Sequence, residues 1–229
     1  MKQDGQNGKE DTYLEERLAR YDQWVQERKV PFSSKVIPVR ESLATQQWVV
    51  PTEQVIEFLR NARSFALTDC TCRSHYRRCD NPVEVCFLLN DAADRYVAEG
   101  IGRNVSLEEA VKVLRQANKR GLVHLTVYEP DQYVYAVCSC CPCCCHDLQF
   151  LRLYGRSDLI ARSEYVVQTD MEACTHCGDC IGRCVFGARV WKDEQMSYDT
   201  AACYGCGLCV TVCPVDANVM QRRQEEMTE

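Results

Sequence analysis

The distribution of apolar positions predicts helices near the start of the chain and a short strand after them. Apolar residues recur with helical spacing from Thr12 to about Lys29, and again over about 52–63. The first pattern is formed by Leu14, Leu18, Tyr21 and Val25. The run SFALTDC at 64–70 suits a short strand, whereas residues 31–50 look irregular to extended. Residues 1–10 are polar and contain glycine, so we expect them to be disordered.

Capping patterns and alternation predict the elements in the middle of the chain. The segment NPVE at 81–84 combines a cap residue, a proline and an acid, which predicts a helix running to about Glu99. The segment SLEE at 106–109 is a capping box whose helix should end at Gly121. The following segments, LVHLTVY and YVYAVCS, read as a β-hairpin. A short helix over about 146–154 should lead to a boundary near residues 156–165.

Composition and charge exclude several classes of protein. Of the 229 residues, 46% are hydrophobic and 26% are charged, as in a globular protein with a packed core. The formal charge of −6 argues against nucleic acid as a main partner. The N-terminus lacks the apolar segment of a signal peptide, and no stretch approaches the about 20 apolar residues of a membrane helix, so we expect a cytoplasmic protein without membrane insertion. No nucleotide-binding or hydrolase nucleophile motif is present, so no catalytic residue is predicted.

Cysteine is the outlier of the composition, with 18 residues in four groups. In a reducing compartment, clustered cysteines bind metal more often than they form disulfides. The groups are Cys70, Cys72, Cys79 and Cys86; Cys138, Cys140, Cys141, Cys143, Cys144 and Cys145; Cys174, Cys177, Cys180 and Cys184; and Cys203, Cys206, Cys209 and Cys213. The last two groups form an internal repeat, in which the same spacing recurs 29 positions later.

Both halves of the repeat have the spacing C-x2-C-x2-C-x3-C, which is typical of [4Fe–4S] ligation. Three thiolates spaced by two residues wrap a tight loop around three corners of a cubane, and glycines in the loop let the backbone approach. The fourth cysteine cannot reach the same cube and ligates the other cluster. The predicted ligands are Cys174, Cys177, Cys180 and Cys213 for cluster I, and Cys203, Cys206, Cys209 and Cys184 for cluster II. A pair of zinc sites is the alternative, but this dense spacing suits zinc poorly.

On these residues, the segment of about 165–220 resembles the bacterial-type double-cluster 2[4Fe–4S] ferredoxin family. The second motif is followed by Pro214, as in that family, whereas Cys184 is followed by valine. The resemblance implies electron transfer at low potential. The close spacing of the motifs suggests a short hairpin between them, over about 189–198. His176 lies inside the first motif, but all four cysteines are present, so we expect it to be exposed or beside the cluster rather than a Rieske-like ligand.

The ten upstream cysteines are more than core packing needs. Strand alternation would place Cys70 with Cys72, and Cys138 with Cys140, on one face. Cys79 and Cys86 flank the predicted helix start at 81–84, where a helix N-terminus would stabilise thiolates. We expect some of these thiols to hold a third iron–sulfur cluster; zinc, a redox-active dithiol or disulfide, and plain reduced cysteines are the alternatives. The candidates are Cys70, Cys72, Cys79, Cys86, Cys138, Cys140, Cys141, Cys143, Cys144 and Cys145.

The segment from Val36 to His146 also resembles an uncharacterised Cys-rich domain found upstream of ferredoxin modules in iron–sulfur proteins of anaerobes. The matching stretches are VIPV (36–39), CTCR (70–73), CDNPVEVC (79–86), SLEEAV (106–111), GLVH (121–124) and CSCCPCCC (138–145). The resemblance implies organisation rather than an activity.

Charged residues near the cysteines could either take part in function or simply form a solvated surface. The segment 164–220 has eight acids and three bases, which would steer docking to a basic redox partner or merely keep the surface soluble. Arg73, Arg77 and Arg78 stand beside upstream cysteines and are interpreted as solvated.

Two other functions stay open. Substrate chemistry at the upstream cysteines would make the protein a redox enzyme. The order strand, helix, helix and hairpin over 64–139 would suit a winged-helix, redox-sensing regulator whose basic residues face DNA, although the acidic charge favours an ordinary solvated helix. The basic residues are Lys112, Arg115, Lys119 and Arg120.

The sequence therefore predicts an α+β iron–sulfur electron-transfer protein, either a ferredoxin-like carrier or the electron-transfer subunit of an anaerobic oxidoreductase. It should contain two [4Fe–4S] clusters and a further cluster upstream, and its partners should be redox proteins. The predicted domains are an N-terminal arm and helix over 1–34, a Cys-rich α/β domain with helices and a β-hairpin over 35–160, a ferredoxin module over 161–222, and a tail over 223–229.

Overall fold

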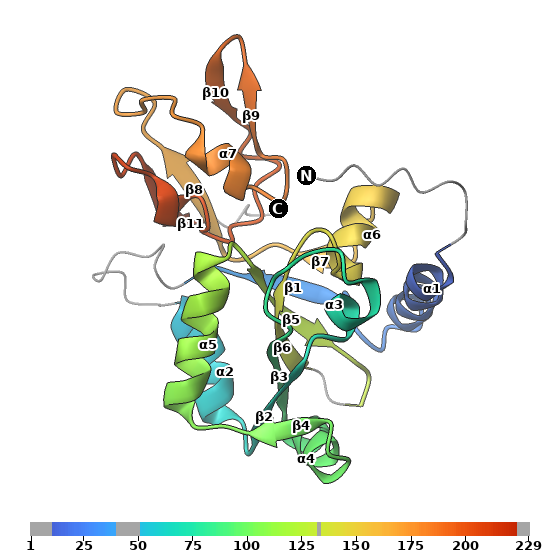
Figure 1. Ribbon diagram of the computed structural model, residues 1–229. Coiled ribbons are helices and arrows are strands. Elements are labelled where there is room, and N and C mark those ends of the chain that lie inside the picture. The colour runs from blue at the N-terminus through green and yellow to red at the C-terminus, as the bar shows by residue number, and fades with distance from the viewer. Residues whose placement is uncertain (1–10, 40–50, 132–133, 224–229) are drawn as a thin grey trace.

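The computed structural model describes residues 11–39, 51–131 and 134–223 (Figure 1). Residues 1–10, which the sequence predicts to be disordered, lie outside the described residues. The later part of the 31–50 segment and most of the predicted tail also lie outside them. Helices accompany sheets whose strands are almost all antiparallel, so the protein is of the α+β class that the sequence predicts. No helix among the described residues is long and apolar enough to span a membrane.

A seven-stranded sheet forms the centre of the upstream part, in the order β4-β2-β3-β6-β5-β1-β7. Its neighbouring strands are antiparallel, apart from the parallel pair β1 and β7. The strands are β1 (Ser34–Ile37), β2 (Phe65–Asp69), β3 (Glu84–Leu89), β4 (Gly102–Asn104), β5 (Val123–Tyr128), β6 (Val134–Cys140) and β7 (Ile160–Ala161). The predicted hairpin is confirmed as β5 and β6, which occupy the middle of this sheet.

Helices cover both faces of the sheet (Figure 1). Alternation along β3 sends Phe87 towards one face, where α2 and α5 pack, and Leu88 towards the other, where α4 packs. Near the cysteine-rich end, α1 packs on α6 through Tyr21 and Phe150. The helices are α1 (Thr12–Gln26), α2 (Pro51–Asn61), α3 (Thr71–Tyr76), α4 (Asn90–Ala98), α5 (Leu107–Lys119) and α6 (His146–Tyr154).

The helix start predicted at Ser106 is confirmed as the N-cap of α5. Ser106 is the N-cap, and its hydroxyl accepts a hydrogen bond from the backbone N–H of Glu109 at 3.1 Å. At the other end Gly121 has a φ of 74°, the left-handed conformation that ends a helix. The predicted helix over 146–154 is also present, as α6.

The helix predicted from residue 81 to Glu99 is wrong in its first half. Residues 84–89 form β3, and α4 begins only at Asn90, which has a φ of 51°. The segment EVCFLL pairs with β2 on one edge and β6 on the other, and helices cover both of its faces. Its residues after Glu84 are all buried, so its sequence shows no alternation. Pairing with two neighbours outweighs the local capping signal.

The winged-helix interpretation is not supported by the topology. A wing is an exposed hairpin, whereas β5 and β6 lie between β1 and β3 inside the sheet. In addition, α5 buries Ala110 and Leu114 together with α2 against the sheet, so it is an ordinary amphipathic core helix.

The C-terminal part consists of two small antiparallel pairs and short helical turns. The hairpin between the cysteine motifs is confirmed, with β9 (Arg189–Lys192) pairing β10 (Gln195–Tyr198). The first and last strands of this C-terminal part, β8 (Tyr165–Thr169) and β11 (Asn218–Arg222), pair with each other. The helical turns are α7 (Asp179–Arg183) and the 3₁₀ turn η2 (Val210–Val212).

The second cysteine motif packs into the core of the upstream part. The backbone N–H of Val39 donates to the carbonyl of Cys206 at 2.8 Å. Tyr204 and Leu208 are buried in the same cluster as Val36 and Leu148. The end of the 203–209 loop nearest β1 is therefore fixed against the sheet.

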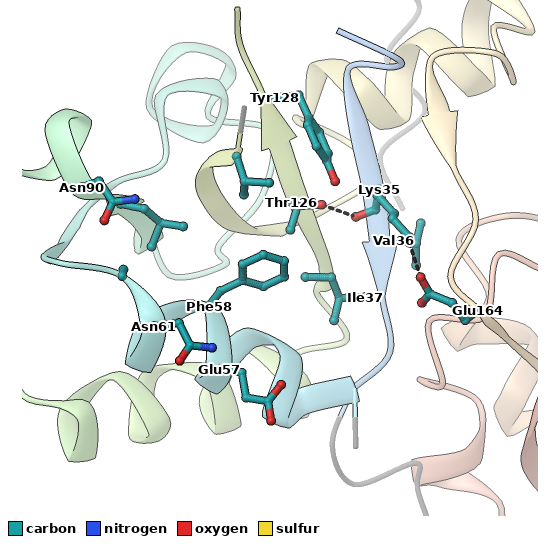
Figure 2. A pocket seen from close by; sticks show the side chains of 13 residues that line it. Lys35, Val36, Ile37, Glu57, Phe58, Asn61, Asn90, Thr126, Tyr128 and Glu164 are labelled. Atoms are coloured by element: carbon teal, nitrogen blue, oxygen red, sulfur yellow. Dashed lines mark hydrogen bonds and ion pairs between the residues drawn. The ribbon is translucent and has the colours of Figure 1, made fainter. Parts of the chain in front are cut away.

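A cavity of about 440 Å³ lies beside α2, β1 and β5 (Figure 2). Part of its polar lining is paired within the cavity: Lys35 forms an ion pair with Glu164, and the hydroxyl of Thr126 donates to the Lys35 carbonyl at 3.4 Å. None of the described residues that line it is a cysteine. This cavity is therefore separate from the predicted chemistry.

Candidate metal centres

The C-terminal cysteines face two small cavities, and each cavity takes cysteines from both motifs. The first is lined by Cys174, Cys177, Cys180 and Cys213. The second is lined by Cys184, Cys203, Cys206 and Cys209. The chain crosses between the cavities because α7 carries Cys184 away from the loop that precedes it, and η2 does the same for Cys213. Among the described residues, no carboxylate lines either cavity.

Glycines allow the two loops their tight turns. Gly178 has a φ of 84° and Gly205 a φ of 73°, conformations that side chains disfavour. A β-carbon on Gly205 would stand 2.0 Å from the carbonyl oxygen of Tyr165, so the second loop passes too close to β8 to accept any side chain there.

The two cavities differ in exposure. Cys177 at the first cavity is exposed, and Cys174 and Cys213 are half-buried. At the second cavity Cys203, Cys206 and Cys209 are all buried. The first cavity therefore lies close to solvent, whereas the second lies against the upstream part of the chain.

His176 does not point its δ-nitrogen at a cysteine. This nitrogen accepts a hydrogen bond from the backbone N–H of Met196 at 3.1 Å, which ties the first motif to β10. The half-buried ring beside the first cavity agrees with the predicted position beside a cluster rather than in it.

Arg189 is a buried cation between the two thiol sets. Its side chain is only 2% exposed, and one guanidinium nitrogen lies 3.8 Å from the Cys180 sulfur. Burial opposes the charge, but the nearby sulfurs of Cys209 and Cys180 raise the pKa of Arg189. The other nitrogen donates to the Thr169 hydroxyl at 2.9 Å. No sequence pattern predicts this role, because an arginine in a short strand usually faces solvent.

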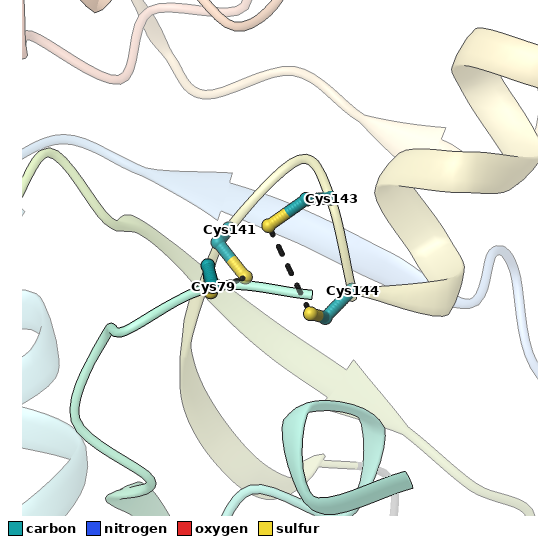
Figure 3. Close-up of side chains that lie close together, drawn as sticks. All are labelled: Cys79, Cys141, Cys143 and Cys144. Carbon is teal, nitrogen blue, oxygen red and sulfur yellow. Dashed lines mark hydrogen bonds between the residues drawn. The ribbon is translucent and has the colours of Figure 1, made fainter. Parts of the chain in front are cut away.

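The ten upstream cysteines separate into two sets in space. Four thiol sulfurs lie within 4.8 Å of one another, those of Cys79, Cys141, Cys143 and Cys144 (Figure 3). The other six line a cavity of about 110 Å³; they are Cys70, Cys72, Cys86, Cys138, Cys140 and Cys145. Cys141 also reaches this cavity, so the two sets adjoin.

The central sheet explains why the six thiols converge. Cys86 on β3 stands directly opposite Cys138 on β6, and Cys140 follows two residues later on the same face, as alternation predicts. The same reasoning fails for Cys70 and Cys72, because β2 ends at Asp69 and α3 begins at Thr71. Both of these thiols nevertheless reach the cavity.

Polar side chains complete the wall of the six-thiol cavity. α1 contributes Tyr13, Arg17, Arg20 and Tyr21. His146 at the start of α6 places its δ-nitrogen 2.9 Å from the Cys72 sulfur, and burial lowers the pKa of this histidine, so the ring is neutral. Its position directly after Cys145 was the signal that sequence reasoning missed.

The upstream thiols influence one another's protonation. Hydrogen bonds from Cys72 and Cys86 lower the pKa of the Cys70 thiol, whereas the contact with Cys70 raises the pKa of Cys72. When one of two neighbouring thiols loses its proton, the other keeps its own and donates to the thiolate, so the pair carries a single negative charge. A bound cation would remove the competition, because thiolates are the metal-binding form.

Two predictions about the surroundings of these cysteines are wrong. Arg73 is not solvated: it is 2% exposed, and its guanidinium donates to the carbonyls of Pro82 and Ser139. Burial opposes its charge, but a hydrogen bond with Cys141 and nearby thiols raise the pKa of Arg73. In addition, residues 81–84 start no helix, so no helix N-terminus stabilises the thiolates of Cys79 and Cys86.

The six-thiol set packs against the C-terminal part. Cys140 and Cys145 belong to the same buried cluster as Tyr204 and Cys206. The Phe186 ring stacks on Tyr204 at 4.4 Å and packs against this cluster. The second C-terminal cavity and the six-thiol cavity thus share one continuous core.

Comparison with known proteins supports the C-terminal assignment. Residues 173–220 match the 4Fe-4S dicluster domain family. A comparison with curated proteins found no match. The chain therefore carries a ferredoxin-like 4Fe–4S module at its C-terminus, downstream of a Cys-rich region. The module and the clustered cysteines together indicate an iron–sulfur electron-transfer role.

Proposed function

We propose that the protein conducts electrons along a row of iron–sulfur clusters, as a ferredoxin-like carrier or as the electron-transfer subunit of an oxidoreductase. One observation carries the proposal: each C-terminal cavity faces four thiols, three from one motif and the fourth from the other. Thiolates without competing carboxylates are the donor set that iron–sulfur clusters require. Cys174, Cys177, Cys180 and Cys213 would hold cluster I, and Cys184, Cys203, Cys206 and Cys209 would hold cluster II.

The exposure of the cysteines supports a direction for the row. Cys177 is exposed, so cluster I would exchange electrons with a redox partner at the surface. Acidic side chains are exposed around this end, at Asp170, Glu172, Asp179 and Asp216, and would attract a basic partner. Cluster II would pass electrons inward, since Cys206 shares a core with Cys140 and Cys145.

The six-thiol cavity is the proposed seat of a third iron–sulfur cluster. Its volume of about 110 Å³ and its soft donors suit a cluster better than a hard cation. The six thiols come from different elements around the cavity, and α1 separates them from solvent through buried Tyr21.

The same cavity favours a second candidate, a redox enzyme. Six thiols exceed the four that a cubane needs, and Arg17, Arg20 and Tyr13 stand opposite them on the cavity wall. An anionic substrate would find both cations and redox-active sulfur there. Adding small anions such as cyanide should then change the EPR spectrum of the upstream cluster alone, and an unchanged spectrum would count against this candidate.

The ligand sets can be tested by pairing serine variants. Under crossed ligation, Cys184→Ser should remove the same EPR signal of the reduced protein as Cys203→Ser. In the same way, Cys213→Ser should match Cys174→Ser. If Cys184→Ser instead matches Cys174→Ser, the crossed assignment is wrong.

The third cluster is tested by iron and sulfide analysis of protein purified without oxygen. Two cubanes contain about eight iron atoms, and a third would raise the content to about twelve. The double variant Cys70→Ser/Cys72→Ser should return the content to about eight while both ferredoxin signals persist. Wild-type protein with iron for two clusters alone would contradict the third cluster.

A further inference from the structure

We infer that Cys79, Cys141, Cys143 and Cys144 form a separate mononuclear site for a tetrahedral divalent metal, zinc, alongside the iron–sulfur clusters. The sulfurs of Cys79 and Cys141 are 3.7 Å apart, and those of Cys143 and Cys144 are 3.8 Å apart (Figure 3). A regular tetrahedron with zinc–sulfur bonds of about 2.3 Å has sulfur–sulfur edges of about 3.8 Å. These two distances match the tetrahedral edge, and the remaining sulfur pairs all lie within 4.8 Å, so the four thiols are close enough together to bind one ion.

The spacing is too small for a cubane. In a [4Fe–4S] cluster each thiolate binds a different iron, so four irons and four sulfides separate the ligand sulfurs. All four sulfurs of this site lie within 4.8 Å of one another, which leaves no room for that core. The spacing is also too large for disulfides, whose sulfurs are about 2 Å apart.

The chain positions the four thiols from two directions. Three come from the turn after β6, where the N–H of Cys145 donates to the carbonyl of Cys141 at 3.0 Å. The fourth, Cys79, comes from the loop between α3 and β3 (Figure 3). The metal would thus tie together two segments that lie about sixty residues apart in the sequence.

The surroundings match the charge of such a site. Four thiolates around a divalent ion carry two excess negative charges, which need donors and cations nearby. The side-chain amide of Asn81 donates to the Cys79 sulfur at 3.4 Å. Arg73 is a buried cation whose pKa is raised by nearby Cys141, and Arg78 donates to the carbonyl of Cys143 at 3.3 Å.

Zinc is the metal that this donor set favours. It binds thiolates more tightly than ferrous iron does, it accepts a closed tetrahedron of four cysteines, and it has no redox chemistry. Cys140 and Cys145 are sequence neighbours of the site and line the six-thiol cavity. A redox-inert ion would therefore fix the geometry of that cavity without taking part in electron transfer.

The test is metal analysis of the full-length protein purified anaerobically. We expect about one zinc per chain that resists chelators, with four sulfur neighbours at about 2.3 Å in the zinc X-ray absorption spectrum. Cys143→Ser should lower zinc binding while the EPR signals of the two ferredoxin clusters persist. The matched control, Cys138→Ser, should keep the zinc and affect only iron.

The inference stands apart from the proposed function, because zinc content is independent of the number of iron–sulfur clusters. Absence of zinc in the wild type, zinc with nitrogen or oxygen ligands, or loss of iron in place of zinc from Cys143→Ser would overturn it. Should Cys143→Ser fail to fold, the wild-type absorption spectrum still decides. Growth with cobalt offers a second readout, the visible ligand-field bands of a tetrahedral tetrathiolate.

Discussion

Replacing Arg189 by glutamine should lower the reduction potentials of both C-terminal clusters. Arg189 is 2% exposed, and in the described part of the chain no carboxylate forms an ion pair with it. Its charge is instead balanced by the sulfurs of Cys180 and Cys209, one from each ligand set. Reduction adds a negative charge to a cluster, so a buried cation stabilises the reduced form, and its removal disfavours reduction.

The size of the effect follows from the distance. A guanidinium nitrogen lies 3.8 Å from the Cys180 sulfur. Two charges at about 4 Å interact by about 4 kcal/mol at an effective dielectric constant of about 20. The added electron is spread over a cluster beyond the sulfur, at roughly twice this distance, which leaves about 2 kcal/mol. For a one-electron couple this corresponds to a fall of about 90 mV.

An EPR-monitored redox titration under anaerobic conditions measures the shift. Lys192→Gln is the matched control, because Lys192 lies on the same strand but is exposed, and solvent screens its charge. Arg189→Lys keeps the charge and should retain most of the potential. Shifts smaller than about 20 mV for both clusters, or a rise in potential, would refute the reasoning.

Four further predictions follow from the described contacts. Tyr204→Ala, which empties a buried position stacked on Phe186, should destabilise the protein by about 3 kcal/mol in denaturant unfolding, and Tyr204→Phe by much less. A Tyr204→Ala variant as stable as the wild type would contradict the packing role. His124 is buried, and burial lowers its pKa to about 4, so the folded protein holds the neutral ring. The free energy of unfolding should therefore fall by about 3 kcal/mol as the pH drops from about 6.5 to about 4, and His124→Gln should lack this part of the pH dependence. Electron transfer to a small basic cytochrome should slow as salt rises, whereas transfer to an uncharged dye should not; equal salt dependence would argue against acidic steering. Limited proteolysis should release no stable fragment of residues 161–222, because the 203–209 loop shares a core with the sheet; such a fragment would show that the parts are independent.

Local signals in the sequence predicted those features that depend on short stretches of chain. The capping box at Ser106 and the β5–β6 hairpin were evident because their causes lie within a few residues. The predicted grouping of each fourth cysteine with the other motif agrees with the lining of the two cavities, and it too has a local cause, because a helical turn carries this cysteine away from the loop before it.

Features that depend on tertiary pairing were not predictable in this way. The segment 84–89 is buried on both faces, so nothing in its period distinguishes a strand from a helix. The division of the upstream cysteines depends on Cys86 facing Cys138, which only the strand order β3-β6 reveals. The burial of Arg73 and Arg189 could not be predicted either, because the thiols that balance their charges are brought to them by the tertiary fold rather than by a local sequence pattern.

The way in which the second motif packs determines how the C-terminal module can work. A free ferredoxin moves as a unit, and its clusters need contact only with their partners. Here the backbone N–H of Val39 donates to the carbonyl of Cys206, and the Arg183 guanidinium donates to the carbonyl of Lys119 at the end of α5, so two separate hydrogen bonds fix the module to the upstream part. A module held in this way cannot rotate its buried end towards a second partner. Under the proposed path, electrons that enter at the exposed end beside Cys177 would pass to the thiol-lined cavity upstream, because Cys206 shares a buried core with Cys140 and Cys145.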